Sequence, residues 1–272
     1  MAHRSAAAII DPVLDFDAPS GKIATTAAQR ILDFIAKENL SVDWILETHA
    51  HADHLSASAF LQRVLKKQRH RAASAIGRGI TEVQGHFREV FGIADEVAAD
   101  GSQFDRLLAD GDRLPLGEID IEVMATPGHT SDSLSYRIAD AVFVGDTVFS
   151  PAAGTARCDF PGGDAVALFH SIRRIYALPA DTRLFLCHDY PPQGEPPRCE
   201  IPLSEMRAAN RHVRDDTAEA DYVALRTQRD ATLPVPRLLL PSLQVNIRGG
   251  KLPAADEHGR LFLKWPLTVA AD

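Results

Sequence analysis

An apolar segment, residues 42–47 (VDWILE), runs directly into residues 48–54 (THAHADH). The apolar segment predicts a short buried β-strand, so His49 and His51, two residues apart at its end, can point the same way. Asp53 and His54 fall where we expect the next helix to begin. Four metal-competent side chains within six residues are costly to bury without a cation or dense hydrogen bonding. The stretch therefore favours a metal site over a solvated histidine-rich turn.

Three more candidate ligands, His129, Asp146 and His188, each come at the end of an apolar segment. The segments expected to form these strands are residues 119–125, 141–145 and 183–187. Strand ends can converge on one edge of a sheet structure, so side chains far apart in the sequence can meet there. The arrangement predicts that these residues belong to the same site as the histidine-rich stretch.

Strand-like and helix-like segments alternate along the chain, which predicts an α/β fold. We expect helices at residues 27–39, 55–68, 164–178, 204–213 and 217–229, and short late strands at 243–247 and 261–265. Residues 1–190 are expected to form the catalytic domain. Residues 191–272 are expected to be an extension packed on the same domain, because they are too few to build an independent core easily.

The composition is that of a globular protein, with 45% hydrophobic and 24% charged residues among 272. The 29 basic and 37 acidic residues give a net charge of −8, which disfavours a nucleic-acid partner. No apolar run approaches the ~18 residues of a membrane span. Asp11 and Pro12 interrupt the short apolar stretch near the start, so no signal peptide is expected and a cytoplasmic location is favoured.

The pattern H-x-H-x-D-H, then a glycine–histidine loop, a Gly-Asp pair and a late histidine, resembles the metallo-β-lactamase superfamily over roughly residues 9–190. This resemblance implies a four-layer αββα sandwich with the metal at one edge, followed by the C-terminal extension. Two further segments, R-C-D-F at residues 157–160 and H-D-Y at 188–190, resemble the persulfide dioxygenases (sulfur dioxygenases) of that superfamily. Residues 226–233 (RTQRDATL) resemble the tail of its bacterial β-lactamase-like hydrolase branch. Cys158 departs from the animal-type motif, which has threonine there.

The candidate ligands alone leave two kinds of metal site open. They are His49, His51, Asp53, His54, His129, Asp146 and His188. Together they can build a site with two Zn(II) per chain, bridged by Asp146, which activates water for hydrolysis as in glyoxalase II-like thioesterases and lactonases. The persulfide dioxygenase resemblance implies instead one Fe(II) per chain, held by His49, His129 and Asp146. Two histidines and one carboxylate leave positions open for other ligands.

The resemblance also implies a reaction and a role for the remaining residues. An iron-dependent persulfide dioxygenase, an oxidoreductase of sulfide oxidation, takes glutathione persulfide with O2 and water to sulfite and glutathione; another small persulfide is the alternative substrate. In that enzyme, His51, Asp53, His54 and His188 surround the metal through hydrogen bonds, whereas in the hydrolase they bind the second metal. Tyr190 and Arg157 are expected to bind substrate, and Tyr190 and Asp159 are expected to be catalytic. Arg157 can alternatively be a structural partner of Asp159. A homodimer is compatible with the resemblance.

Overall fold

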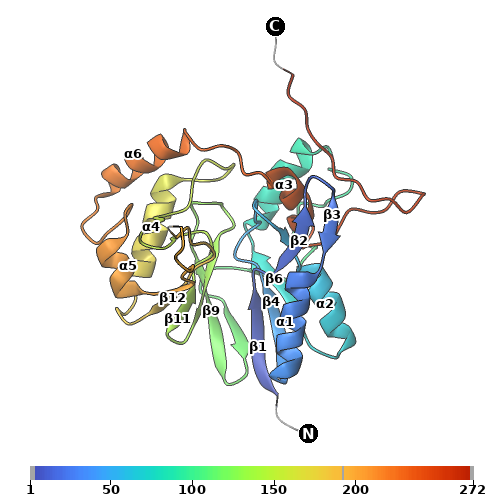
Figure 1. Ribbon diagram of the computed structural model, residues 1–272, viewed down its shortest axis with the longest axis horizontal. Helices are drawn as coiled ribbons and strands as arrows, with labels where there is room; N and C mark the ends of the chain where they lie inside the picture. The colour runs from blue at the N-terminus through green and yellow to red at the C-terminus, as the bar shows by residue number, and fades with distance from the viewer. Residues whose placement is uncertain (1–3, 192, 270–272) are drawn as a thin grey trace. The chain divides into compact units, whose positions relative to one another are not determined.

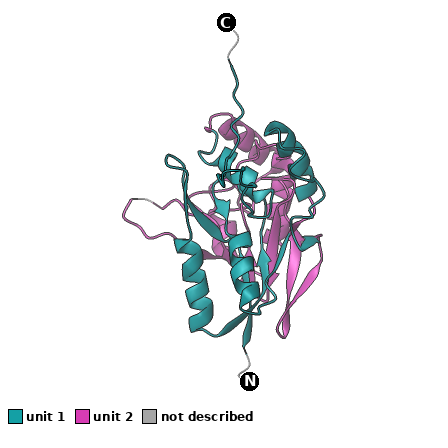
Figure 2. Cartoon of the chain, turned by 90° about the vertical axis from the view of Figure 1, so that its right-hand side faces the viewer, with its two compact units in different colours: residues 1–75, 80–107, 235–272 teal, residues 76–79, 108–234 magenta. Residues whose placement is uncertain are grey.

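The computed structural model describes residues 4–191 and 193–269. Two compact units make up the chain (Figure 2). Unit 1 combines the chain up to Ala75 with residues 80–107 and everything from Val235 onward, and unit 2 combines residues 76–79 with Leu108–Pro234. The expected extension is thus divided between the units at Pro234, and its last residues, 270–272, lie outside the described residues, as do residues 1–3 of the expected catalytic domain.

Unit 1 contains most of a sheet with the strand order β1-β4-β6-β7, in which β1 pairs with β4, and β4 with β6, in parallel; only the last residues of β6 and β7 belong to unit 2. These strands are β1 (Ser5–Ile10), β4 (Leu40–Leu46), β6 (Ala73–Gly77) and β7 (Arg106–Leu108). Helices α1 (Thr26–Lys37) and α2 (Ser58–Lys67) pack on β4 (Figure 1). Ala28, Leu32 and Ile35 lie at helical spacing on α1 and are buried in this core, which explains why the segment folds as an amphipathic helix.

Smaller elements complete unit 1. They are the sheet of β3 (Lys22–Ala24), β2 (Val13–Asp17) and β5 (Leu55–Ser56), and the helices α3 (Ile80–Val90) and α7 (Leu239–Asn246). α7 contacts both β5 and α3. The late part of the chain therefore packs beside the segment that follows the histidine-rich stretch.

Unit 2 carries a six-stranded sheet in the order β13-β12-β11-β10-β9-β8. The strands are β8 (Arg113–Leu116), β9 (Ile119–Ala125), β10 (Leu134–Ile138), β11 (Ala141–Phe143), β12 (Arg183–Phe185) and β13 (Glu200–Pro202). The helices are α4 (Ala165–Tyr176), α5 (Leu203–Ala209) and α6 (Glu219–Asp230), and α4 packs against α6 (Figure 1). Val142 and Leu184 of the sheet share a buried apolar cluster with Leu168 and Ile172 of α4.

The α/β architecture confirms the expected class, but four local expectations are wrong. The helix expected at 204–213 ends already at Ala209. Residues 243–247 do not form a strand, because α7 covers Leu239–Asn246, and residues 261–265 form no strand either. The helix expected at 55–68 begins only at Ser58, after β5. Residues 241–246 of α7 are all buried, and periodicity cannot separate such a short buried helix from a buried strand. Pro241 fits in its first turn, where a backbone N–H has no helical partner.

Within residues 4–191 and 193–269, no helix is both long enough and apolar enough to cross a membrane.

Candidate metal centre

In both units, candidate ligands lie just after the end of a strand, as the sequence predicts. In unit 1, His49 follows β4. In unit 2, His129 follows β9, Asp146 follows β11 and His188 follows β12. His49, His129 and Asp146 are all buried, which is unusual for polar side chains unless hydrogen bonds or a cation stabilise them.

In unit 1, a chain of hydrogen bonds fixes the tautomer of His49. The Thr48 hydroxyl donates to Asp11 Oδ2 at 2.8 Å and lies 3.0 Å from His49 Nδ1. A hydroxyl has one proton, and here Asp11 takes it, so the oxygen accepts from His49 Nδ1–H. Asp11 is itself held in a left-handed turn (φ 48°) and accepts the Thr48 backbone N–H at 2.7 Å. The lone pair of the His49 ring is therefore on Nε2, the nitrogen that can bind a metal.

His51 lies among carboxylates. Its Nε2 is 3.0 Å from Asp11 Oδ1 and 3.9 Å from Glu47 Oε2. Burial lowers the pKa of His51, but the charges of Asp11, Asp53 and Glu47 outweigh it and raise this pKa to about 10. Burial and the Asp11 charge raise the pKa of Glu47 to about 7. His51 of the histidine-rich stretch is thus part of a charged cluster with Asp11, Glu47 and Asp53.

Asp53 and His54 form a second group with His51. Their ligand-type atoms lie within 4.8 Å of one another, and the His54 and His51 rings are 4.3 Å apart. His54 Nδ1 lies 3.3 Å from Asp53 Oδ1. Burial and the neighbouring His51 lower the pKa of His54, which favours the neutral imidazole that metals bind.

The sequence analysis missed Asn246, the last residue of α7. Its Nδ2 donates to the backbone carbonyls of His51 and His54, both at 2.8 Å, and its Oδ1 accepts the Ser56 N–H at 2.8 Å. Asn246 is only 4% exposed. It therefore fixes the backbone of the histidine-rich stretch from 195 residues away, and no local sequence signal marks that role.

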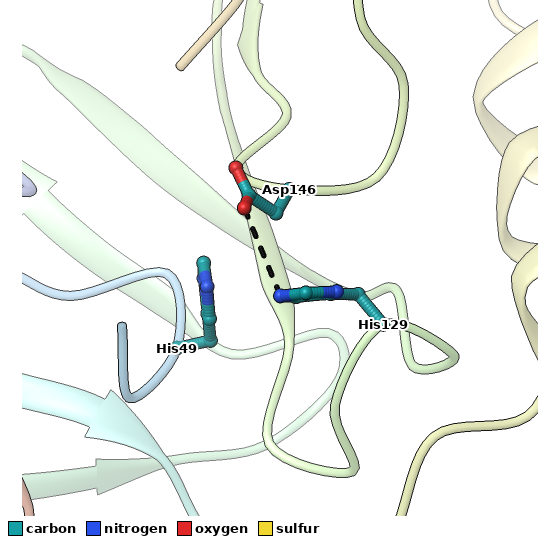
Figure 3. A group of neighbouring side chains, drawn as sticks. All are labelled: His49, His129 and Asp146. Atoms are coloured by element: carbon teal, nitrogen blue, oxygen red, sulfur yellow. Dashed lines mark ion pairs between the residues drawn. The ribbon is translucent and has the colours of Figure 1, made fainter. Parts of the chain in front are cut away.

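In unit 2, His129 and Asp146 face each other. His129 Nδ1 lies 2.7 Å from the Arg157 carbonyl oxygen, which can only accept, so the ring proton is on Nδ1. Nε2 then bears the lone pair, and it lies 3.7 Å from Asp146 Oδ2. Figure 3 draws this pair, with a dashed line between the two atoms, together with His49 of unit 1. Two electron-pair donors that face each other at this distance fit a cation between them.

Glycine makes the His129 turn possible. Gly128 has φ +136°, and a Cβ there would lie 2.3 Å from the backbone nitrogen of Leu168 on α4. The Gly128 carbonyl accepts the Asp164 N–H at 2.8 Å, directly before α4 begins. The loop that carries His129 is thus pressed against the first turn of α4, which only glycine allows.

His188 and Tyr190 lie next to Asp146 and Phe149. His188 Nε2 is 3.4 Å from Asp146 Oδ1. The Tyr190 ring is stacked 6.0 Å from the His188 ring at 10°, and Phe149 meets His188 edge-on at 5.6 Å. Tyr190 is 65% exposed, so its ring is accessible to a molecule in solution.

Arg157 pairs with Asp159. Arg157 Nε and Nη2 each donate to Asp159 at 2.6 Å, and Nη1 donates to the Pro234 carbonyl at 2.8 Å. The guanidinium also lies 5.2 Å from the Phe160 ring centroid. This geometry matches the structural alternative that the sequence left open for Arg157. Its role as a substrate anchor stays a prediction.

The profile of the metallo-beta-lactamase superfamily matches residues 1–188. The chain belongs to the metallo-beta-lactamase superfamily. The expected α/β fold of this superfamily is thereby confirmed.

Individual relatives of this superfamily bear different names. A "Beta-lactamase hydrolase-like protein" of Xylella fastidiosa (strain 9a5c) is 52% identical over 96% of this chain, and the chain spans only 59% of that relative's length. "Glyoxylase B2" of Dictyostelium discoideum is 42% identical, over 96% of this chain and 88% of its own. The crystal structure of ETHE1 from Myxococcus xanthus is similar with a TM-score of 0.68 and 27% identity, covering 90% of this chain and 88% of its own.

Proposed function

We propose that this chain is an iron-dependent persulfide dioxygenase. It oxidises glutathione persulfide, or another small persulfide, with O2 and water to sulfite and the corresponding thiol, which is glutathione for glutathione persulfide. The likeness to ETHE1 from Myxococcus xanthus carries this proposal, together with the two sequence segments that resemble persulfide dioxygenases. It extends over 90% of the chain at 27% identity. The Arg157–Asp159 fork beside His129 and the His188–Tyr190 stack beside Asp146 support it, because these are the residues of the two motifs that resemble persulfide dioxygenases.

One Fe(II) per chain would be held by His49, His129 and Asp146. The ring protons of both histidines are on Nδ1, so each offers Nε2, and the set comprises two imidazoles and a carboxylate. An ion in such a set has positions left for a sulfur ligand and for O2. Ligands whose outer nitrogen is already hydrogen-bonded hold their orientation better, since the ring cannot turn without losing that bond.

The other residues would orient the substrate and the ligands. His188 lies against Asp146 and would hold the carboxylate in place. Tyr190, exposed and stacked on His188, would contact the persulfide. Asp159 and the Pro234 carbonyl hold the Arg157 guanidinium, and Arg157 would present the second N–H of Nη1 and of Nη2 to a substrate carboxylate. His51, Asp53 and His54 would support the site through hydrogen bonds.

A dinuclear zinc hydrolase is the second candidate, a thioesterase or lactonase like glyoxalase II. The group His51, Asp53 and His54 in unit 1 favours it, because its ligand-type atoms lie within 4.8 Å of one another and suit zinc. The name of the Dictyostelium relative, "Glyoxylase B2", points in the same direction.

Metal content and oxygen consumption separate the two candidates. For the dioxygenase we expect about one iron per chain and O2 uptake with glutathione persulfide, measured with an oxygen electrode. Asp146→Ala should abolish uptake, whereas Asp140→Ala, which removes an exposed acid paired with Arg183 in the same unit, should leave it unchanged. Two zinc ions per chain with hydrolysis of S-lactoylglutathione and no O2 uptake would refute the dioxygenase and support the hydrolase.

A further inference from the structure

We propose that Arg226 and Asp230 are positioning residues for His129, acting through the loop of residues 155–158. This inference rests on the proposed metal centre. The two residues belong to the RTQRDATL segment at 226–233, to which the proposed reaction assigns no role. They lie on α6, and their link to the His129 imidazole runs through the loop, whose Arg157 carbonyl accepts from His129.

Arg226 and Asp230 form a buried pair one turn apart on α6. Arg226 is 1% exposed and Asp230 is 7% exposed. Arg226 Nε and Nη2 both donate to Asp230 Oδ1, at 2.9 and 2.5 Å. Oδ1 thus accepts the hydrogen bonds from both Nε and Nη2, and the other carboxylate oxygen, Oδ2, binds a different partner.

Each member of the pair also holds one end of the loop. Arg226 Nη1 donates to the carbonyl of Thr155 at 3.0 Å. Asp230 Oδ2 accepts the backbone N–H of Cys158 at 2.8 Å. The backbone is therefore fixed before and after Arg157, whose carbonyl accepts the proton of His129 Nδ1 at 2.7 Å.

The loop is held both by packing and by directed hydrogen bonds. Thr155, Ala156 and Cys158 are buried, and Cys158 also lines, with Asp159 and Asp230, an open cavity of about 490 Å³. A buried ion pair contributes little net stability compared with apolar residues of similar volume, because its desolvation costs about as much as the attraction returns. Apolar residues, however, cannot fix a backbone through directed hydrogen bonds. The geometry therefore points to orientation, and not stability, as the role of this pair.

The test compares two double variants that both remove the buried charges. R226M/D230N keeps a side-chain carbonyl that can accept the Cys158 N–H, and R226M/D230L keeps none. R226K, which retains both charges but lacks the fork, serves as a milder variant in case a double variant fails to fold. D140N breaks the exposed Arg183–Asp140 fork of the same unit and is the matched control.

The first measurement is the tautomer of His129 in the metal-free protein by nitrogen-15 NMR. Wild type and D140N should show a single Nδ1–H form, R226M/D230L a mixture of both tautomers, and R226K and R226M/D230N intermediate behaviour. The second measurement is Fe(II) affinity by competition with a chelator. Loss of an outer hydrogen-bond partner typically weakens metal binding about 10–100-fold, and we expect a loss of that size for R226M/D230L and a smaller one for R226M/D230N.

A single Nδ1–H form in R226M/D230L and R226K would overturn the inference, as would equal metal affinity in all the variants. Equal losses in both double variants, in proportion to a lowered Tm, would also overturn it, because they would show a purely structural role. If wild-type protein binds neither iron nor zinc, the proposed function fails. The tautomer measurement then still decides the positioning role, since it needs no metal.

Discussion

The candidate ligands of the two units are held in place in different ways. In unit 1, His49 is oriented by side chains, through the Thr48 hydroxyl and the Asp11 carboxylate. In unit 2, His129 is oriented by a main-chain carbonyl, that of Arg157. Both arrangements put the ring proton on Nδ1. A substitution can therefore remove the Thr48 hydroxyl that accepts from His49. The Arg157 carbonyl that accepts from His129 cannot be removed by a substitution, and it can be displaced only by changing the residues that hold its loop.

Electrostatic surroundings also differ between the units. His51 of unit 1 is buried beside Asp11, and the acidic charges raise its pKa to about 10. His212 of unit 2 is buried beside arginines. Burial, together with the charges of Arg226, Arg229 and Arg211, lowers its pKa to about 4. Burial acts in the same direction on both rings, so the sign of the neighbouring charge decides the outcome.

Asn246→Ala should give the largest effect and tests how far unit 1 depends on a distant side chain. The change leaves three buried backbone groups, at His51, His54 and Ser56, without their partner. Each such loss costs about 1–3 kcal/mol, so we expect the free energy of unfolding to fall by about 3 kcal/mol or more, as measured by urea denaturation.

Gln29→Ala is the control for Asn246→Ala, because the Gln29–Asp33 contact is exposed on α1 and its loss should change stability by less than about 0.5 kcal/mol. A fall of less than about 1 kcal/mol for Asn246→Ala would mean that the histidine-rich stretch keeps its backbone without α7.

The free energy of unfolding should fall at acidic pH because of His212 in unit 2. Its folded pKa of about 4 lies below the ordinary value of 6.5, so the unfolded chain binds the proton first. The contribution of neutral His212 to the free energy of unfolding is complete above pH 6.5, and it is lost as the pH falls from 6.5 to about 4. The loss reaches at most about 3 kcal/mol. Unfolding measured between pH 7 and pH 4 should show it.

His212→Gln should remove this part of the pH dependence, and His170→Gln, at an exposed ring of the same unit, should not. The ring has little room to adapt. His212 Nδ1 accepts the Thr155 N–H at 3.0 Å, and a Cβ on Gly154 would lie 2.1 Å from that nitrogen. An unchanged pH dependence in His212→Gln would assign the acid sensitivity to other groups.

Thr48→Val should have the smallest effect on stability and the most specific effect on the site. Valine keeps the shape but removes the hydroxyl between Asp11 and His49, so the His49 ring loses the acceptor of its Nδ1 proton. We expect Fe(II) affinity to fall about 10-fold, measured by chelator competition, with a cost in stability of about 1–2 kcal/mol.

Thr182→Val, at a buried threonine that precedes β12 in unit 2, is the matched control and should not alter metal affinity. Equal affinity in Thr48→Val and wild type would show that the side-chain support of unit 1 is dispensable. The contrast between the two units would then lose its functional meaning.

The sequence by itself determined which residue types stand at the strand ends. The alternation of apolar segments and the H-x-H-x-D-H pattern predicted the α/β class and the positions of His49, His129, Asp146 and His188, because strand periodicity and strand ends are local properties. It mistook α7 for a strand, since a short, buried helix has no periodic pattern to read.

Only the tertiary structure decided which nitrogen each histidine presents and what holds its loop. Asp11 reaches Thr48 across 37 residues, Asp230 reaches Cys158 across 72, and Asn246 reaches His51 across 195. A hydrogen bond depends on the distance and direction between two groups in space, and the chain sets these only when it folds.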